Sequence, residues 1–106
     1  ELILPYEDKS VNSNFHLYVL QVKENPNFDR YDLFSYLRSK DYLPMVHYIP
    51  VHLLSYYKNL YGLKRGDFPV AEKFYDRAIS IPLYPSLSDA EVEKVVMDIT
   101  TFTESY

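Results

Sequence analysis

The segment from Phe15 to Val22 is the feature that most constrains how this chain folds. Its pattern is typical of a β-strand, in which successive side chains point to opposite faces. Both faces are largely apolar, with Tyr18, Leu20 and Val22 on one and Leu17, Val19 and Gln21 on the other. Because a strand with two apolar faces must be covered on both sides, this segment predicts the central strand of a sheet.

Helical and extended patterns follow one another along the rest of the chain. Further strands are predicted over residues 42–49 and 79–83, the second at a sheet edge because Pro82 cannot donate to a neighbouring strand. Helices are predicted over residues 29–40, 53–61 and 69 to about 80, and from Ser88 to a tail that frays beyond Thr103. Three strands and three long helices pack most economically as a two-layer α+β sandwich, in which helices cover a short sheet.

The predicted helices begin and end at residues with suitable chemistry. Asn27 or Asp29 can cap the first helix, and Ser88 with Glu91 forms a capping box at the last. Gly62 ends the short helix. Apolar residues at helical spacing predict buried stripes on the third and last helices: Val70, Phe74 and Ala78 on the third, and Val92, Val95, Val96, Ile99 and Phe102 on the last.

The chain of 106 residues is long enough for one domain. We expect residues 1–14 to be a linker entering from a large domain outside this chain, and residues 15–106 to be the domain itself. The apolar start of the linker, Leu2 to Pro5, is expected to pack on that other part of the protein. Because the first residue is Glu1 and not methionine, we expect the chain to be a piece of a longer protein.

Composition excludes several classes of function. The net charge is −4 with no basic run, which argues against nucleic acid as a partner. Without cysteine there is no disulfide and no thiolate metal site, which fits a cytoplasmic protein. No apolar run approaches the roughly 20 residues that span a bilayer, so no membrane partner is expected.

The residues that carry candidate chemistry are His47, Tyr48, Ile49, Pro50 and His52. They lie where an apolar run gives way to a loop, because Pro50 ends any strand pairing, and such loops often present binding groups. A metal site would need more converging ligands than these histidines supply, and no nucleophile motif supports a hydrolytic triad. From the residues alone, a hydrogen-bonded histidine that holds the loop at the strand end is favoured over a histidine that binds a ligand.

Three motifs in order give the chain a family resemblance: residues 47–53 (HYIPVHL), 66–72 (GDFPVAE) and 81–89 (IPLYPSLSD). Over residues 16–99 the chain resembles the C-terminal domain of the DegT/DnrJ/EryC1/StrS sugar aminotransferases. The FHLY segment at 15–18 and the loop at 47–50 resemble most closely the subgroup that makes pseudaminic acid precursors, the transaminase of UDP-4-amino-4,6-dideoxy-N-acetyl-altrosamine. This family usually has a glycine in left-handed conformation after the first helix, where Asp41 stands here.

The resemblance implies the small domain of a fold-type I, pyridoxal-phosphate-dependent enzyme. Such an enzyme aminates a UDP-linked 4-keto-6-deoxy sugar with an amino-acid donor, for which the resemblance implies glutamate, and works as a homodimer. His47, Tyr48, Ile49, Pro50 and His52 would then line the nucleotide-sugar pocket. The cofactor lysine would belong to the missing large domain, because no lysine here lies in the family's lysine motif, so this chain alone is expected to be inactive. The alternative is a non-catalytic interaction or nucleotide-sugar-binding module derived from the family.

Overall fold

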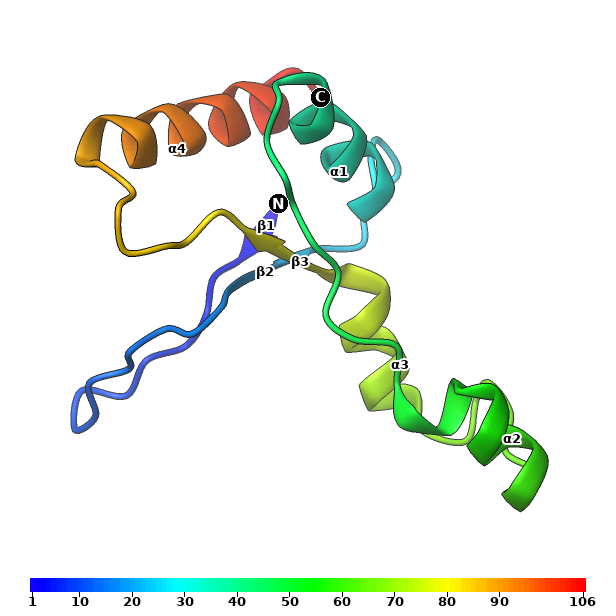
Figure 1. Cartoon of the computed structure of the whole chain (residues 1–106). Helices are drawn as coiled ribbons and strands as arrows, with labels where there is room; N and C mark the ends of the chain where they lie inside the picture. Colours follow the sequence, from blue (N-terminus) through cyan, green and yellow to red (C-terminus); the bar gives the residue numbers. More distant parts are fainter.

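A computed structural model describes all 106 residues (Figure 1). The sheet contains β1 (Leu2–Ile3), β2 (Tyr18–Val22) and β3 (Ala78–Ile81) in the order β1-β2-β3, with both pairs antiparallel. The central position predicted for the second of these strands is therefore confirmed. In the pair of β2 with β3, Leu20 lies opposite Ile79, and both are buried.

The first strand lies in the segment that we expected to be a linker. Leu2 pairs with Val22, and the Lys23 N–H donates to the Glu1 carbonyl at 2.8 Å. Leu2 packs against the core of this domain and not only on another part of the protein. The free edge of β2 explains the difference, because its unpaired backbone groups gain partners from any extended segment that reaches them.

Two helices, α1 (Arg30–Ser39) and α4 (Asp89–Glu104), lie together on one side of the sheet (Figure 1). Leu33 and Leu37 of α1 are completely buried there. The two-layer α+β arrangement is confirmed, and its core is built from one sheet face and these helices: Leu20, Val22, Phe28, Leu33, Leu37, Ile79, Val95, Ile99 and Phe102.

The stripe predicted on α4 is only partly correct. Val95, Ile99 and Phe102 are buried, but Val92 and Val96 are exposed. The C-terminal tail does not fray as predicted, because the Tyr106 ring packs on Phe102 with centroids 5.2 Å apart. α4 thus presents a narrow face to the core, and its flanking valines remain on the surface.

Both long helices begin with the predicted caps. The Asp29 carboxylate accepts from the Asp32 N–H at 3.0 Å, and the Asp32 carboxylate accepts in turn from the Asp29 N–H. Ser88 and Glu91 form the same reciprocal arrangement at α4. These contacts satisfy backbone donors that the helices leave unpaired, so each helix start is set by neighbouring residues alone.

Asp41 occupies the left-handed region expected after α1, with φ 65°. We expect Asp41→Gly to stabilise the fold by up to about 1 kcal/mol, because glycine adopts this conformation without strain and removes a negative charge near the helix C-terminus. Urea denaturation followed by far-ultraviolet circular dichroism measures the change. Asp41→Asn is the matched control for charge, and a Gly variant less stable than the Asn variant would contradict the conformational argument.

Residues 42–49 do not form the predicted strand. They run past β3 with a single bridge, in which Met45 N–H donates to the Ser80 carbonyl at 3.0 Å and Ser80 N–H to the Met45 carbonyl at 2.8 Å. Pro44 has no N–H to extend the ladder before this bridge, and Pro50 lacks one beyond it. The His47–Tyr48 peptide bond is cis. β3 lies at the edge of the sheet, as predicted, with only the Met45 bridge on its outer side.

The residues between Pro50 and Arg77 form an arm that extends from the sheet, on the opposite side from α4 (Figure 1). The single helix predicted over 53–61 is a short 3₁₀ turn, η1 (Val51–Leu53), followed by α2 (Ser55–Tyr61), which ends at left-handed Gly62. α3 (Pro69–Arg77) stops before Ala78, where β3 begins. None of the helices is both long and apolar enough to cross a membrane.

The apolar face predicted on the third helix is largely uncovered. Val70 is 83% exposed and Phe74 is also exposed, whereas Ala78 is buried in β3. α2 contains no buried residue. The arm therefore carries apolar side chains that this chain alone does not cover, and α3 buries a carboxylate, Glu72, instead of the predicted stripe.

Candidate functional site

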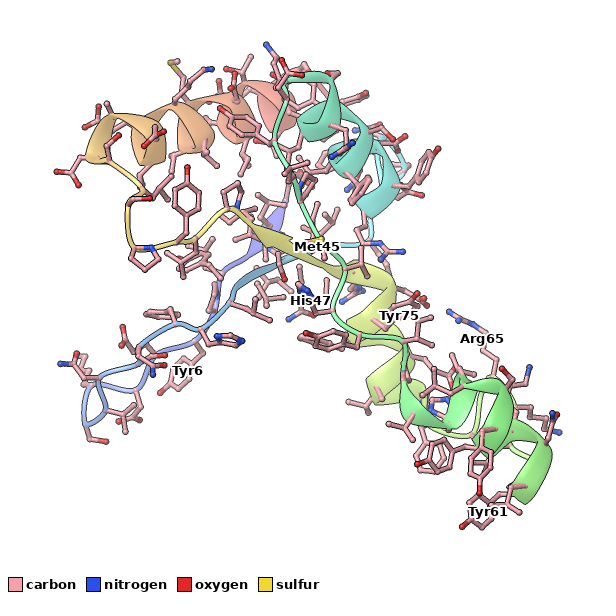
Figure 2. All side chains as sticks on the ribbon, viewed as in Figure 1. Tyr6, Met45, His47, Tyr61, Arg65 and Tyr75 are labelled. Atoms are coloured by element: carbon pink, nitrogen blue, oxygen red, sulfur yellow. The ribbon has the colours of Figure 1, made fainter.

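His47 holds its loop to the sheet. Its Nδ1 atom lies 2.9 Å from the Ser80 Oγ atom, and Ser80 also forms the backbone bridge with Met45. Because side chains alternate along β3, Ser80 lies on the face away from the buried Ile79 and the core helices. Figure 2 shows Met45 and His47 where the loop passes the sheet. The loop-holding role considered for His47 is therefore present.

Beyond His47 the loop lines a mainly apolar groove with a volume of about 710 Å³. Tyr48 is 73% exposed, and its ring lies 4.5 Å from the His47 ring. The opposite wall is the turn before α3 and the exposed side of that helix. Its lining includes His47, Tyr48, Pro50, Phe68, Val70 and Phe74.

The structure separates the remaining two predicted site residues from this groove. Ile49 is half exposed but does not line it. His52 is only 6% exposed, and its Nε2 atom lies 2.7 Å from the Glu72 carboxylate. Three of the five residues, His47, Tyr48 and Pro50, are thus brought together, and His52 lies behind the wall.

Glu72 is a structural residue of the site that the sequence analysis missed. It is 6% exposed, and its carboxylate accepts from His52, from the Gly66 N–H at 2.9 Å and from the Phe68 N–H at 3.2 Å. Burial acts to raise the pKa of Glu72, but the Gly66, His52 and Phe68 donors together lower it below its usual range. The one sequence signal for Glu72 was its position at the end of the GDFPVAE motif. Its helical pattern alone gave no sign of burial, because a glutamate on a surface helix normally faces solvent.

A second groove, of about 560 Å³, opens on the other side of His47 between the 42–47 segment and α4. Lys40 and Lys94 lie at its rim, and Tyr42 forms part of its wall. The Tyr42 hydroxyl donates to the Asp98 carboxylate at 2.7 Å, and Lys40 Nζ lies 3.7 Å from the same carboxylate. Burial, followed by the hydrogen bond and the charge of Asp98, raises the pKa of Tyr42 to about 12.

The arrangement is suited to binding and contains no complete catalytic centre. The two buried carboxylates are both occupied, Glu72 by backbone donors and His52, and Asp98 by Tyr42 and Lys40. No group of three His, Cys, Asp or Glu side chains is placed to hold a metal ion. An exposed tyrosine ring, a histidine and apolar walls can instead receive a flat or partly apolar ligand with hydroxyl groups.

The residues present do not fit pyridoxal phosphate on their own. A phosphate is usually held at a free helix N-terminus, but α1, α3 and α4 each carry a carboxylate in or beside the first turn, from Asp29, Glu72 and Glu91. Of the two lysines at the rim of the second groove, Lys40 is paired with Asp98, and Lys94 lies over the Tyr42 ring. No step of a pyridoxal reaction is therefore assigned to this chain.

The three-stranded antiparallel sheet with its helices matches the small domain of fold-type I aminotransferases. The profile of the DegT/DnrJ/EryC1/StrS aminotransferase family matches residues 1–100, and the chain belongs to this family. The family resemblance of the sequence motifs is thereby confirmed.

Two curated relatives and one solved structure illustrate the similarity. The chain is 40% identical over 97 residues to the spore coat polysaccharide biosynthesis protein SpsC of Bacillus subtilis, covering 90% of this chain and 25% of that protein. It is 30% identical to the dTDP-3-amino-3,6-dideoxy-alpha-D-galactopyranose transaminase of Aneurinibacillus thermoaerophilus. This match covers 83% of this chain and 22% of that protein. Helicobacter pylori PseC, an aminotransferase involved in pseudoaminic acid biosynthesis, shares the fold with a TM-score of 0.76 at 24% identity. The match covers 86% of this chain and 24% of PseC.

The chain thus spans about a quarter of the length of the curated relatives it matches.

Proposed function

We propose that this chain is the C-terminal small domain of a pyridoxal-phosphate-dependent aminotransferase that aminates a nucleotide-linked keto-sugar. The observation that carries the proposal is the exposed Tyr48 beside His47 in an apolar groove, within a chain of the sugar aminotransferase family. The uncovered apolar side chains of α2 and α3 support a place within a larger protein, because a surface of this kind usually meets another surface.

The acceptor that we propose is a UDP-linked 4-keto-6-deoxy sugar, and the donor is glutamate. The FHLY segment at 15–18 and the HYIP loop at 47–50, which resemble the pseudaminic acid subgroup, support this choice. A dTDP-linked sugar is the competing acceptor, because the name of the Aneurinibacillus relative refers to one. Comparing the two nucleotides with the same sugar distinguishes these acceptors.

In this proposal the small domain binds and orients the acceptor. The Tyr48 ring gives a flat face for the sugar or the base, and its hydroxyl forms a hydrogen bond. His47 lines the groove and is fixed through Nδ1 to Ser80, so the histidine ring can offer its other nitrogen to the acceptor without losing its position. Ile49 and Pro50 shape the loop. When bound, pyridoxal phosphate supplies the electron sink for amino transfer, and the large domain provides its lysine and phosphate site. The proposal includes a homodimer and a cytoplasmic location.

We expect His47→Ala and Tyr48→Phe in the full-length protein to raise the KM for the sugar nucleotide roughly three- to tenfold, as for loss of one hydrogen bond. The rate of the half-reaction with glutamate should be unchanged, because in this proposal the two side chains contact the acceptor and not the cofactor or the glutamate. Steady-state kinetics and single-turnover absorbance measure the two quantities. Tyr31→Phe, at an exposed position on α1 outside the groove, is the control, and wild-type kinetics for both loop variants would contradict the site.

A binding module without chemistry is the second candidate, because this chain has a groove but no pyridoxal site of its own. The visible spectrum of the full-length protein distinguishes the candidates. A pyridoxal absorbance band that shifts when glutamate is added supports the aminotransferase. A protein that stays colourless with added pyridoxal phosphate supports the module, for which calorimetry with UDP-sugars is the next measurement.

A further inference from the structure

The contact between His52 and Glu72 joins two parts of the arm that are 20 residues apart in sequence. From Met45 to Ala71, His52 is the only buried residue. No apolar side chain of this segment is fully buried, so its apolar packing is limited. A short hydrogen bond between a ring N–H and a carboxylate has a strong directional preference, and here it provides the anchor.

The Glu72 carboxylate also fixes the turn before its own helix. The Gly66 N–H donates to both carboxylate oxygens at 2.9 Å, and the Phe68 N–H donates to one of them at 3.2 Å. The Arg65 Nε atom, 4.0 Å from the carboxylate, lies at the solvent side of the same group. Gly66 has φ 101°, a conformation that glycine adopts without strain, so the turn can bring its N–H to the carboxylate.

These contacts set the spacing between the two walls of the groove. On one side, His52 lies two residues after Pro50, which lines the groove with Tyr48. On the other side, Phe68 follows the turn held by Glu72, and its ring lies 4.8 Å from the His52 ring. His47 and Ser80 hold the loop only before Tyr48, so moving either partner of the His52–Glu72 pair would displace the Phe68 side of the groove relative to Tyr48.

We propose that His52 and Glu72 form a positioning pair that holds the Tyr48 wall and the Phe68 wall of the acceptor groove at the spacing the sugar nucleotide requires. The pair does not touch the ligand, since both side chains are buried behind the wall. The inference rests on the proposed function for the identity of the ligand, but the effect of the pair on the turn is independent of it.

The test uses Glu72→Gln in the full-length protein, because glutamine keeps the size of the side chain but cannot accept from the two backbone donors and His52 as a carboxylate does. We expect amide hydrogen exchange at Gly66 and Phe68 to accelerate roughly tenfold or more as the turn opens. We also expect the KM for the UDP-sugar to rise roughly tenfold, with the glutamate half-reaction unchanged. Glu93→Gln, which removes the same charge from an exposed position on α4, is the matched control.

A second pair of variants protects the test against simple misfolding. Glutamine can place an N–H near the position of the His52 Nε2 atom, so His52→Gln should retain more acceptor affinity than His52→Leu, which fills a similar volume but cannot donate. A general loss of packing would not produce this order, since the two side chains are of similar size. His16→Gln is the control for the loss of a histidine at an exposed position.

The outcomes separate this inference from the proposed function. Wild-type exchange at Gly66 and Phe68 in the Glu72→Gln protein would overturn the pair, whatever the activity. Faster exchange with an unchanged KM would overturn its role in acceptor binding. If the wild-type protein aminates no sugar nucleotide, the proposed function fails, and faster exchange in the variant still supports the pair as the anchor of the arm.

Discussion

Leu33→Ala is expected to destabilise the fold by about 2–5 kcal/mol, a large share of the 5–15 kcal/mol typical of a whole domain. Leu33 is completely buried in α1 and belongs to the core formed with the sheet and α4. The loss includes the transfer of the leucine side chain from water and the cavity that remains, because neighbours anchored in three elements relax only partly. Urea denaturation followed by far-ultraviolet circular dichroism measures the shift.

Leu43→Ala is the matched control, because Leu43 is 71% exposed and its truncation should change stability by less than about 0.5 kcal/mol. Equal effects of the two substitutions would show that the core does not lie between the sheet, α1 and α4. An effect at Leu43 alone would place the stabilising contacts in the groove beside α4.

Asp98→Ala is expected to cost about 1–3 kcal/mol, because it leaves the partly buried Tyr42 hydroxyl without its acceptor. The contact joins residues 56 positions apart and ties the end of α1 to α4. Tyr42→Phe and the double variant complete a mutant cycle that isolates the energy of this pair. Additive effects in the cycle would contradict a direct interaction.

The same pair predicts a dependence of stability on pH. Because the pKa of Tyr42 is raised to about 12 from an ordinary value of 10.0, the folded protein holds this proton more tightly than the unfolded chain. The stabilisation is therefore complete below pH 10 and is lost as the pH rises from 10 to 12. The titration of Tyr42 is measured as the tyrosinate absorbance of the wild-type protein minus that of the Tyr42→Phe protein. The Asp98→Asn substitution should lower the pKa of Tyr42. A Tyr42 that titrates at 10 would contradict the assignment.

The candidate site was only partly predictable from the sequence. His47, Tyr48 and Pro50 form a continuous loop, so their proximity follows from the chain itself. His52 is five residues beyond His47, yet it turns away from the groove because Glu72 binds it from another helix. Glu72 has no local partner that would mark it as buried, and its surroundings become visible only in the folded arm.

Local physical chemistry determined the helix caps, the turn at Gly62 and the central strand, because each depends on residues within a few positions of one another. The caps need only neighbouring donors and acceptors, and the strand needs only its alternating apolar pattern. These features were correct in the sequence analysis, with boundaries that differ by a few residues.

Only the tertiary structure decided which extended segments pair and which helical faces are buried. Leu2 joins the sheet because β2 has a free edge, whereas the 42–49 segment makes one bridge because its prolines interrupt the ladder. Val70 stays exposed because nothing in this chain lies against that side of α3. Periodicity shows that a face is apolar, but burial depends on a partner that is distant in sequence, and an isolated pattern carries no information about that partner.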